Sequence, residues 1–228
     1  MPSHTERYVP AAGHAALTGI YDTAMARTMR EHAWRPRLTE AVVDGLPEGG
    51  VVVDVGCGTG TQAIAVARAR PDAHVIGVDG DSQVLAIAAT KPGAQHLELR
   101  DGLVDHLPLA DAEADRIILS LVLHHLQPDR KITALRETRR VLAPQGQLHV
   151  IDWDTPAGPF TRLCFSALQL LDGRSNTRDH ASGRWRDAFQ AAGLQSPHTL
   201  RRLPTAWGTL AHIATGHPAT RPQPSRTA

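Results

Sequence analysis

The chain has 228 residues, of which 42% are hydrophobic and 21% charged, and these proportions are typical of one soluble globular domain. A formal net charge of +1 excludes the broad basic field that draws nucleic acid or an anionic membrane surface to a protein. Two cysteines, no apolar run of transmembrane length and no paired metal-ligand spacing lead us to expect a cytoplasmic protein with neither integral membrane association nor a metal.

The N-terminal part of the chain is predicted to form a flexible start followed by a helical cap. Prolines and a glycine interrupt residues 1–16, which we expect to be flexible. One folded domain is expected over 17–215, and its first part, 17–46, carries apolar residues at helical spacing. The cap residues expected to contact the core are Tyr21, Met25, Met29, Leu38 and Val42.

Residues 51–60, V-V-V-D-V-G-C-G-T-G, are a β-branched run that ends in three glycines at every second position. The run predicts a strand buried on both faces, and the alanine-rich segment 61–70 predicts a helix. A strand, a glycine turn and a helix in succession bring the backbone close to a nucleotide-type ligand and point free amides at it. A tight turn without a ligand is the alternative.

The spacing of these glycines separates two classes of ligand. A dinucleotide fingerprint requires a glycine three places after Gly58, but Thr61 stands there and the third glycine is Gly60. Asp54, just before the turn, would repel a phosphate and suits a positively charged ligand. The pattern therefore argues against NAD and for a cationic cofactor.

The next two strands are predicted at 74–79 and 96–100. Asp79 ends the first of them, where a carboxylate accepts hydrogen bonds from both hydroxyls of a ribose. Because several classes of cofactor contain that ribose, Asp79 alone does not separate them. Asp81 or Ser82 is expected to cap a helix that runs to about Thr90.

Strands and helices continue to alternate in the second half of the chain. Apolar runs and alternating patterns predict strands at 114–125, 148–152, 199–203 and 208–213. Helical periodicity predicts helices at 130–142, 160–171 and 184–192. Segment 153–183 is expected to be a variable insertion on the substrate side, and the tail 216–228 to be disordered.

The predicted helix 160–171 is apolar on more than one face and must be covered. Three partners could pack on it and do not exclude one another: the N-terminal segment, an apolar substrate, and a second subunit in a homodimer.

The glycine motif, Asp79, the segment S-L-V-L-H-H-L (120–126) and the segment R-E-T-R-R-V-L-A-P-Q-G (136–146) resemble the class I S-adenosylmethionine (SAM) dependent methyltransferases. The likeness is greatest to the type 11 group around the ubiquinone/menaquinone-biosynthesis methyltransferases, and it spans about 21–213. It implies an α/β, Rossmann-like fold with a seven-stranded, mostly parallel sheet, helices on both faces and an antiparallel C-terminal strand pair.

The resemblance also implies a cofactor site at the carboxyl ends of the strands. The residues implied to bind SAM are Asp54, Gly56, Cys57, Gly58, Thr59, Gly60, Asp79, Gly80, Gly102, Leu103, Ser120 and Leu121. Leu103 departs from the family, which usually has an aspartate there that contacts adenine, and Gln145 replaces a family glycine. Adenine is then expected to meet backbone groups and Leu103, with Asp101 or Asp105 nearby.

Methyl transfer from a sulfonium requires positioning above all, and a base only where the nucleophile must lose a proton. The candidate bases are His124 and His125 first, then Tyr21, His180 and Asp152. Paired histidines at this place also commonly begin a helix, one facing the protein and the other the solvent. The residues expected to contact the substrate are Tyr21, His125, Asp152, Trp153 and His180.

The function predicted first is a SAM-dependent methyltransferase that acts by in-line displacement on the oxygen, nitrogen or carbon of a small, apolar acceptor and releases S-adenosylhomocysteine (SAH). A non-enzymatic SAM-binding sensor or partner subunit is the second hypothesis. An NAD-linked oxidoreductase is the third, disfavoured by Thr61 and Asp54.

Overall fold

The computed structural model describes residues 29–156, 158, 161–163, 165, 166, 169 and 174–218. The predictions for Tyr21 and Met25, for the flexible start and for the tail from residue 219 lie outside the described residues. So does much of segment 160–171, including the side chains on which a dimer contact would depend.

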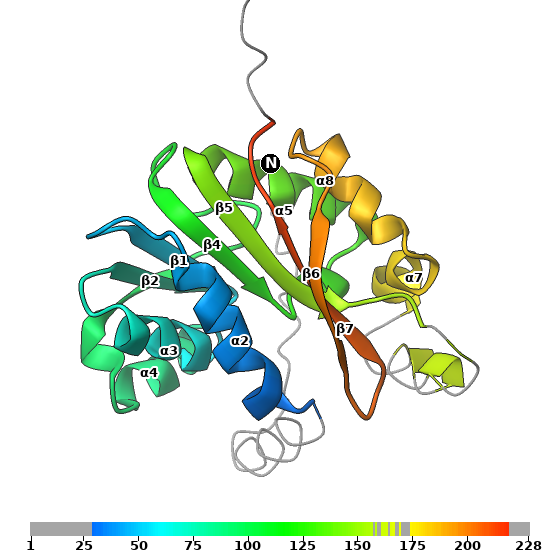
Figure 1. The fold of residues 1–228 in the computed structure, drawn as a ribbon, viewed down its shortest axis with the longest axis horizontal. Coiled ribbons are helices and arrows are strands. Elements are labelled where there is room, and N and C mark those ends of the chain that lie inside the picture. The colour runs from blue at the N-terminus through cyan, green and yellow to red at the C-terminus, as the bar shows by residue number, and fades with distance from the viewer. Residues whose placement is uncertain are drawn as a thin grey trace, which may run out of the picture.

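The described chain forms one seven-stranded sheet in the order β3-β2-β1-β4-β5-β7-β6 (Figure 1). Its strands are β1 (Val51–Val55), β2 (His74–Asp79), β3 (Leu97–Asp101), β4 (Ala114–Ser120), β5 (Leu142–Trp153), β6 (His198–Pro204) and β7 (Thr209–Thr215). The pairs from β3 to β5 are parallel, and β7 is antiparallel to both β5 and β6. The predicted mostly parallel sheet with an antiparallel C-terminal pair is confirmed.

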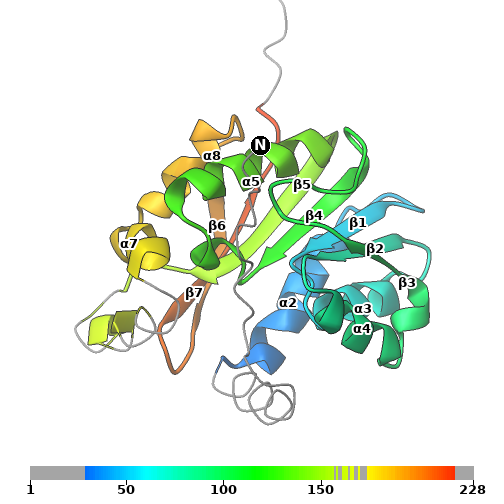
Figure 2. The ribbon, with the colours of Figure 1, turned by 180° about the vertical axis from the view of Figure 1, so that it is seen from behind.

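Helices cover both faces of the sheet, as the two opposite views show (Figures 1 and 2). They are α2 (Glu31–Val43), α3 (Thr61–Ala69), α4 (Ser82–Thr90), α5 (Pro128–Val141), α7 (Arg174–Ser182) and α8 (Asp187–Ala191). Three short 3₁₀ turns join them, at η1 (Ala94–His96), η2 (Leu123–His125) and η3 (Arg184–Arg186).

Alternating residues of the buried strands divide the core into two halves, because successive side chains of a strand point to opposite faces. Val52 and Ile118 pack in the half that contains Leu38 and Val42 of α2 and Val66 of α3. Val53 and Ile117 pack in the half that contains Leu135 of α5 and Phe189 of α8. The predicted core contacts Met29, Leu38 and Val42 are all buried.

Two predicted strands have other bounds in the structure, and one helix was not predicted. Strand β5 begins at Leu142 instead of 148, because residues 143–146 form an irregularity in its pairing with β4 and the strand continues through it. Strand β4 ends at Ser120, and the histidines that follow lie in η2. Helix α7 was not predicted, since its sequence is polar and it is held by buried ion pairs described below.

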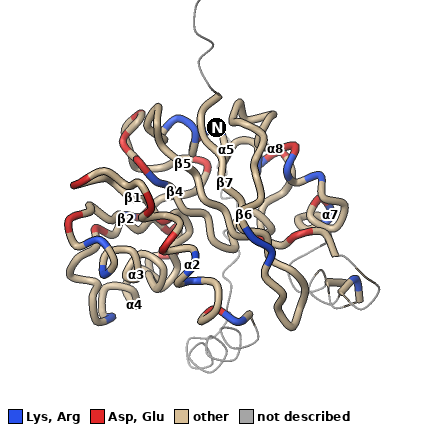
Figure 3. Tube along the Cα trace, in the orientation of Figure 1, with Lys and Arg blue, Asp and Glu red and all other residues tan. Residues whose placement is uncertain are grey.

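Charged residues of both signs are scattered over the described elements (Figure 3). Within the described part of the chain, no helix is both long and apolar enough to cross a membrane.

Candidate active site

The carboxyl ends of β1 to β5 lie along one edge of the sheet, because these strands are parallel and in register. Val55 of β1 is paired with Val78 of β2 and Leu119 of β4, so the residues that follow these strands are neighbours. The predicted site residues Gly56, Asp79, Gly102, Ser120 and Asp152 all stand at or just beyond this edge. The edge thus gathers candidate residues from five strands.

The glycine turn after β1 uses the left-handed backbone region at all three glycines, with φ of 70° at Gly56, 53° at Gly58 and 72° at Gly60. A Cβ on Gly56 would lie 2.6 Å from Cγ2 of Val122, so the turn packs tightly against the segment after β4. A Cβ on Gly58 would meet nothing within 4 Å among the residues that the structure describes. Gly58 therefore borders open space, where a ligand can approach the backbone.

Four of the five amides of this turn donate hydrogen bonds within the protein, and the prediction of free amides is wrong for these four. Gly56 N and Cys57 N both donate to the carbonyl oxygen of Val78, at 2.8 and 3.0 Å, and Gly60 N donates to Cys57 O. Gly58 N donates to Oδ2 of Asp79 at 2.8 Å. A turn whose amides are satisfied internally is unsuited to cradling a phosphate, which agrees with the argument against a dinucleotide.

Asp79 is fixed by backbone donors at both carboxylate oxygens. Besides the bond from Gly58, Oδ1 accepts from Asp81 N at 3.0 Å, and Asp81 in turn caps α4 as predicted. A carboxylate has about four acceptor positions, so two backbone bonds leave capacity for two hydroxyl donors. The side chain is half-buried at the sheet edge, in the place where a ribose was predicted.

Asp54 is completely buried beneath the turn, and neither of its carboxylate oxygens has a hydrogen-bond partner among the described residues. Burial raises the pKa of Asp54 to about 7, although the positive charge of Arg35 on α2 opposes the shift. An unpaired buried carboxylate is costly. A cation close to Asp54 would remove that cost.

The side chains of Cys57 and Thr59 each contact another part of the protein. The Cys57 thiol is buried against Gly77, and burial raises its pKa well above the ordinary range, so it is an inert packing group. Thr59 Oγ1 accepts a hydrogen bond from Lys91 Nζ, which ties the turn to the end of α4.

Leu103 lies over the end of β2, where the family has its adenine-contacting acid. Its side chain is 48% exposed, and a Cβ on Gly80 would come within 2.7 Å of its Cδ2. Gly102 N donates to Asp79 O at 3.1 Å and so connects this loop to the same strand. The exposed face of Leu103 is an apolar surface beside Asp79.

Leu121, directly after Ser120, adopts an unusual backbone conformation with φ of 60°. Its amide donates to Ile151 O at 2.8 Å, which holds the turn against β5. A non-glycine residue in this region is strained, and such strain often marks functional sites. The sequence contains no signal of this strain.

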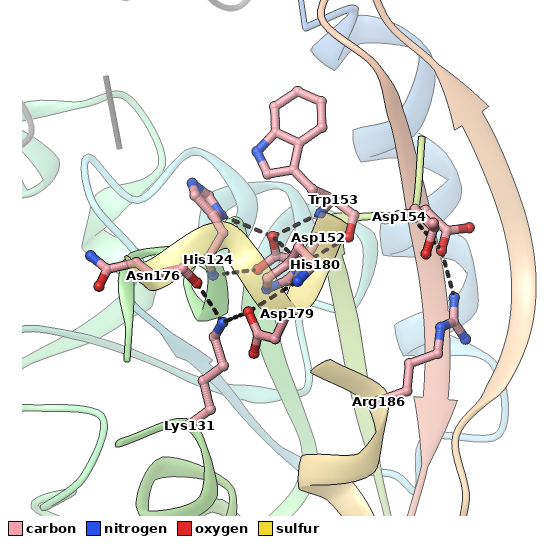
Figure 4. A network of polar contacts seen from close by, with 10 residues as sticks. His124, Lys131, Asp152, Trp153, Asp154, Asn176, Asp179, His180 and Arg186 are labelled. Atoms are coloured by element: carbon pink, nitrogen blue, oxygen red, sulfur yellow. Dashed lines mark hydrogen bonds and ion pairs between the residues drawn. The ribbon is translucent and has the colours of Figure 1, made fainter. Parts of the chain in front are cut away.

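A buried network of charged and imidazole groups lies at the ends of β4 and β5 (Figure 4). His124 Nδ1 is 2.8 Å from Asp152 Oδ1, and His124 N donates to Oδ2 at 3.3 Å. His180 Nδ1 is 2.8 Å from Trp153 O and 3.9 Å from Asp152 Oδ1. Burial opposes ionisation of Asp152, but the two rings and its hydrogen bonds outweigh burial and lower its pKa below the ordinary value.

A second ion pair supports this network from α5. Lys131 Nζ, fully buried, donates to Asp179 Oδ1 at 2.5 Å and to Asn176 O at 2.7 Å. Asp179 Oδ1 also accepts from His180 N at 3.0 Å. The pair therefore ties α7 to α5 and holds His180 beneath Asp152. Sequence reasoning missed Lys131, although its place on the apolar side of α5, one turn before Leu135, was a signal.

The structure brings His124, His180, Asp152 and Trp153 together, and His125 lies beside His124 at the margin of this group. His124 is buried, whereas the adjacent His125 is exposed, with ring centroids 4.0 Å apart. Trp153 is buried and packs edge-on against Phe165 at 6.2 Å. Among the residues described, no group of three or more histidine, cysteine or acidic side chains is arranged to hold a metal ion.

Comparison with known proteins identifies relatives of this chain. Residues 52–146 match a family described as "Methyltransferase domain". The chain is 33% identical over 167 residues to a ubiquinone/menaquinone biosynthesis C-methyltransferase of Rubrivivax gelatinosus, covering 72% of this chain and 60% of that enzyme. It is 30% identical over 152 residues to the uncharacterized protein YafE of Escherichia coli, covering 67% of this chain and 68% of YafE.

A solved structure shows the same fold. CalO1, a methyltransferase in calicheamicin biosynthesis crystallised with SAH, aligns with a TM-score of 0.65 and 23% identity, covering 90% of this chain and 59% of CalO1. The chain spans only part of several curated relatives, for example 55% of a demethylmenaquinone methyltransferase of Lactobacillus johnsonii.

Proposed function

The chain belongs to the SAM-dependent methyltransferase family, and we propose that it transfers the methyl group of SAM to a small-molecule acceptor. The single observation that carries this proposal is the pairing of Gly58 with Asp79. The turn leaves open space beside Gly58 while its amide fixes the carboxylate of Asp79. That combination suits an adenosine-containing ligand without a phosphate.

The residues present fit SAM at three places. Asp79 has acceptor capacity for the ribose hydroxyls, and the exposed face of Leu103 offers an apolar surface to adenine. Asp54 lacks a partner among the described residues and suits the positive charge of the methionine part of SAM. We place Ser120 and Leu121 beside that same part, at the end of β4.

When bound, SAM supplies a methyl group that is already activated, since its leaving group departs as a neutral thioether. The protein's contribution is to hold the acceptor atom in line with the methyl carbon, at roughly 3 Å, and to exclude water. Asp79 and the glycine turn fix the cofactor, and with it the position of the methyl carbon. The end of β5, with Asp152 and Trp153, borders the acceptor end.

The proposal includes an apolar acceptor and a cytoplasmic protein. The relatives named for quinone biosynthesis and for calicheamicin biosynthesis support a small organic acceptor. The net charge of +1 and the scattered charges do not favour a nucleic acid.

Isothermal titration calorimetry with SAM, SAH and NAD tests the proposed function. We expect heat of binding with the two sulfur ligands and none with NAD. Asp79→Ala should weaken SAM binding at least tenfold, about 1.4 kcal/mol or more. Asp111→Ala, an exposed acid just before the amino end of β4, is the control and should bind normally. Absence of heat with both SAM and SAH would refute the proposal.

A further inference from the structure

We propose that Leu103 holds the nucleobase of the cofactor by apolar contact alone and that no side chain binds the 6-amino group of adenine. The cofactor site therefore accepts purine analogues that lack this group. This inference rests on the proposed function and adds to it the range of cofactors that the site takes. The order of the strands, the packing of Leu103 and the partners of the neighbouring acids support it.

The order of the strands places the nucleobase beyond Asp79, over the loop that follows β3. Asp54 lies on β1, Asp79 ends β2, and β3 is the next strand outward in the same direction. With the cationic end of SAM at Asp54 and its ribose at Asp79, the remaining part, the base, continues toward β3. Adjacent strands lie about 4.8 Å apart, so this step brings the base to the residues that follow Asp101.

Leu103 occupies this loop in a fixed position. Its Cδ2 fills the space that Gly80 leaves, since a Cβ on Gly80 would lie 2.7 Å from it. The loop is anchored beside it, because Gly102 N donates to Asp79 O at 3.1 Å and a Cβ on Gly102 would lie 2.5 Å from Cδ of Pro108. Leu103 nevertheless remains 48% exposed. Such a surface fits the face of a planar base and offers its amine no hydrogen bond.

Asp105, two positions after Leu103, is paired with a cation on the other face of the sheet. Its Oδ2 accepts from Nε and Nη2 of Arg130 on α5, at 3.2 and 2.6 Å. Val78, the neighbour of Asp79 in β2, packs in the same half of the core as α5. Asp79 therefore points to the opposite face, because successive side chains of a strand alternate. The ion pair with Arg130 holds Asp105 away from the side on which Asp79 lies.

His106 and Asp81 are engaged elsewhere as well. The pKa of Glu137 on α5 is lowered chiefly by its hydrogen bond to Arg140 and in part by the charge of His106, which therefore lies near α5. Oδ1 of Asp81 accepts from Gln83 N at 2.8 Å and caps α4. Both side chains thus serve contacts within the protein.

Asp101 is the remaining acid of the loop, and it lies at the level of the ribose. It ends β3 and its register partner is Asp79, so the two residues stand side by side at the sheet edge. Leu103 follows two positions later, which in an extended chain is an advance of about 6.6 Å. The place beyond Asp79 is therefore taken by an apolar side chain, and Asp101 is the competing acceptor that a variant can test.

The 6-amino group distinguishes the two modes of recognition. An amine that meets an ionised carboxylate gains a charge-assisted hydrogen bond, and loss of that bond weakens binding by about tenfold or more. A base held by apolar contact loses little when the amine is removed, because this contact depends on the area of the ring.

Isothermal titration calorimetry compares SAH with its 6-deamino analogue, in which purine replaces adenine and nothing else changes. The two dissociation constants of the wild type should differ by less than about fivefold. Leu103→Asp places a carboxylate where the leucine lies and should prefer SAH over the analogue by about tenfold or more. Leu200→Asp is the matched control, because Leu200 is similarly exposed, at 42%, and lies on β6 at the opposite edge of the sheet. It should behave as wild type.

Two further measurements locate the base at Leu103 independently of its amine. Leu103→Ala should weaken the binding of both ligands equally, by about three- to tenfold, through lost apolar contact. Gly80→Ala should act in the same direction, because its Cβ would displace Cδ2 of Leu103. In leucine-methyl-labelled protein bound to SAH, NMR should show nuclear Overhauser contacts from the Leu103 methyl groups to the protons of the base.

Three results would overturn the inference while SAH still binds and the proposed function stands. The first is a wild-type preference for SAH over the analogue of about fivefold or more, and its disappearance in Asp101→Asn would identify Asp101 as the acceptor. The second is a Leu103→Asp variant that discriminates no better than Leu200→Asp. The third is the lack of contacts between the Leu103 methyl groups and the base. Failure to bind both SAM and SAH would instead overturn the proposed function itself.

Discussion

The carboxylate of Asp54 makes the stability of the cofactor-free protein depend on pH, and Asp54→Asn should remove that dependence. With a pKa of about 7 in the folded protein, against about 3.8 unfolded, Asp54 holds a proton more tightly in the folded state. Its contribution is therefore fully present below about pH 4 and is lost as pH rises through 7.

The expected magnitude follows from these two pKa values. Between pH 5 and pH 8 the wild-type protein should lose about 2.5 kcal/mol of unfolding free energy relative to Asp54→Asn. Most of the loss falls between pH 5 and 7, where the unfolded carboxyl is ionised and the folded one is still protonated. Asparagine fills the same volume without titrating, so the difference between the two proteins isolates this group.

Urea unfolding at four pH values from 5 to 8 measures the difference, with Asp101→Asn as an exposed acid control that should follow wild type. Saturating SAM should flatten the wild-type curve if its cationic end lies at Asp54, because the ligand stabilises the ionised form. Parallel stability curves for wild type and Asp54→Asn would refute the reasoning. A wild-type slope that SAM leaves unchanged would refute the placement of the cation.

Two further predictions use matched pairs of variants. Gly56→Ala should lower the unfolding free energy by about 1–3 kcal/mol, because its Cβ would clash with Val122. Gly58→Ala should lower it less. It should instead weaken SAM binding in calorimetry, since its Cβ enters the open space. Lys131→Met should lower the unfolding free energy measured in urea by about 3 kcal/mol, because the buried Asp179 carboxylate loses its partner. The double variant with Asp179→Leu should regain much of that free energy. Equal stabilities of the single and double variants would contradict this expectation.

Sequence reasoning succeeded where one local pattern determined one element. The β-branched run and the glycines gave β1 and the turn after it, and Asp81 gave the start of α4, because these depend on residues adjacent in the chain. The mostly parallel order of the sheet was implied by the resemblance to the methyltransferases, with which the alternation of strands and helices agrees. The edge that gathers the site residues followed in turn from that order.

The parts that could not be predicted depend on contacts between distant residues. Lys131 and Asp179 are 48 positions apart, and only the packing of α7 on α5 makes them a buried pair. Helix α7 has a polar sequence, and ion pairs instead of an apolar stripe hold it against the rest of the protein. The satisfied amides of the glycine turn depend on Val78 in a neighbouring strand, so the motif alone did not reveal them.

Two buried carboxylates at the same sheet edge have pKa values displaced in opposite directions, and this contrast connects the two halves of the site. Asp54 is buried without a hydrogen-bond partner in the described residues. Burial raises its pKa, and a neighbouring cation would stabilise its ionised form. Asp152 is equally buried but surrounded by imidazole and amide donors, so its pKa falls and it stays ionised. Environments that separate the pKa values of like groups commonly assign them different tasks. We therefore assign Asp54 to the charge of the cofactor, and Asp152 to fixing the ring of His124 at the ends of β4 and β5.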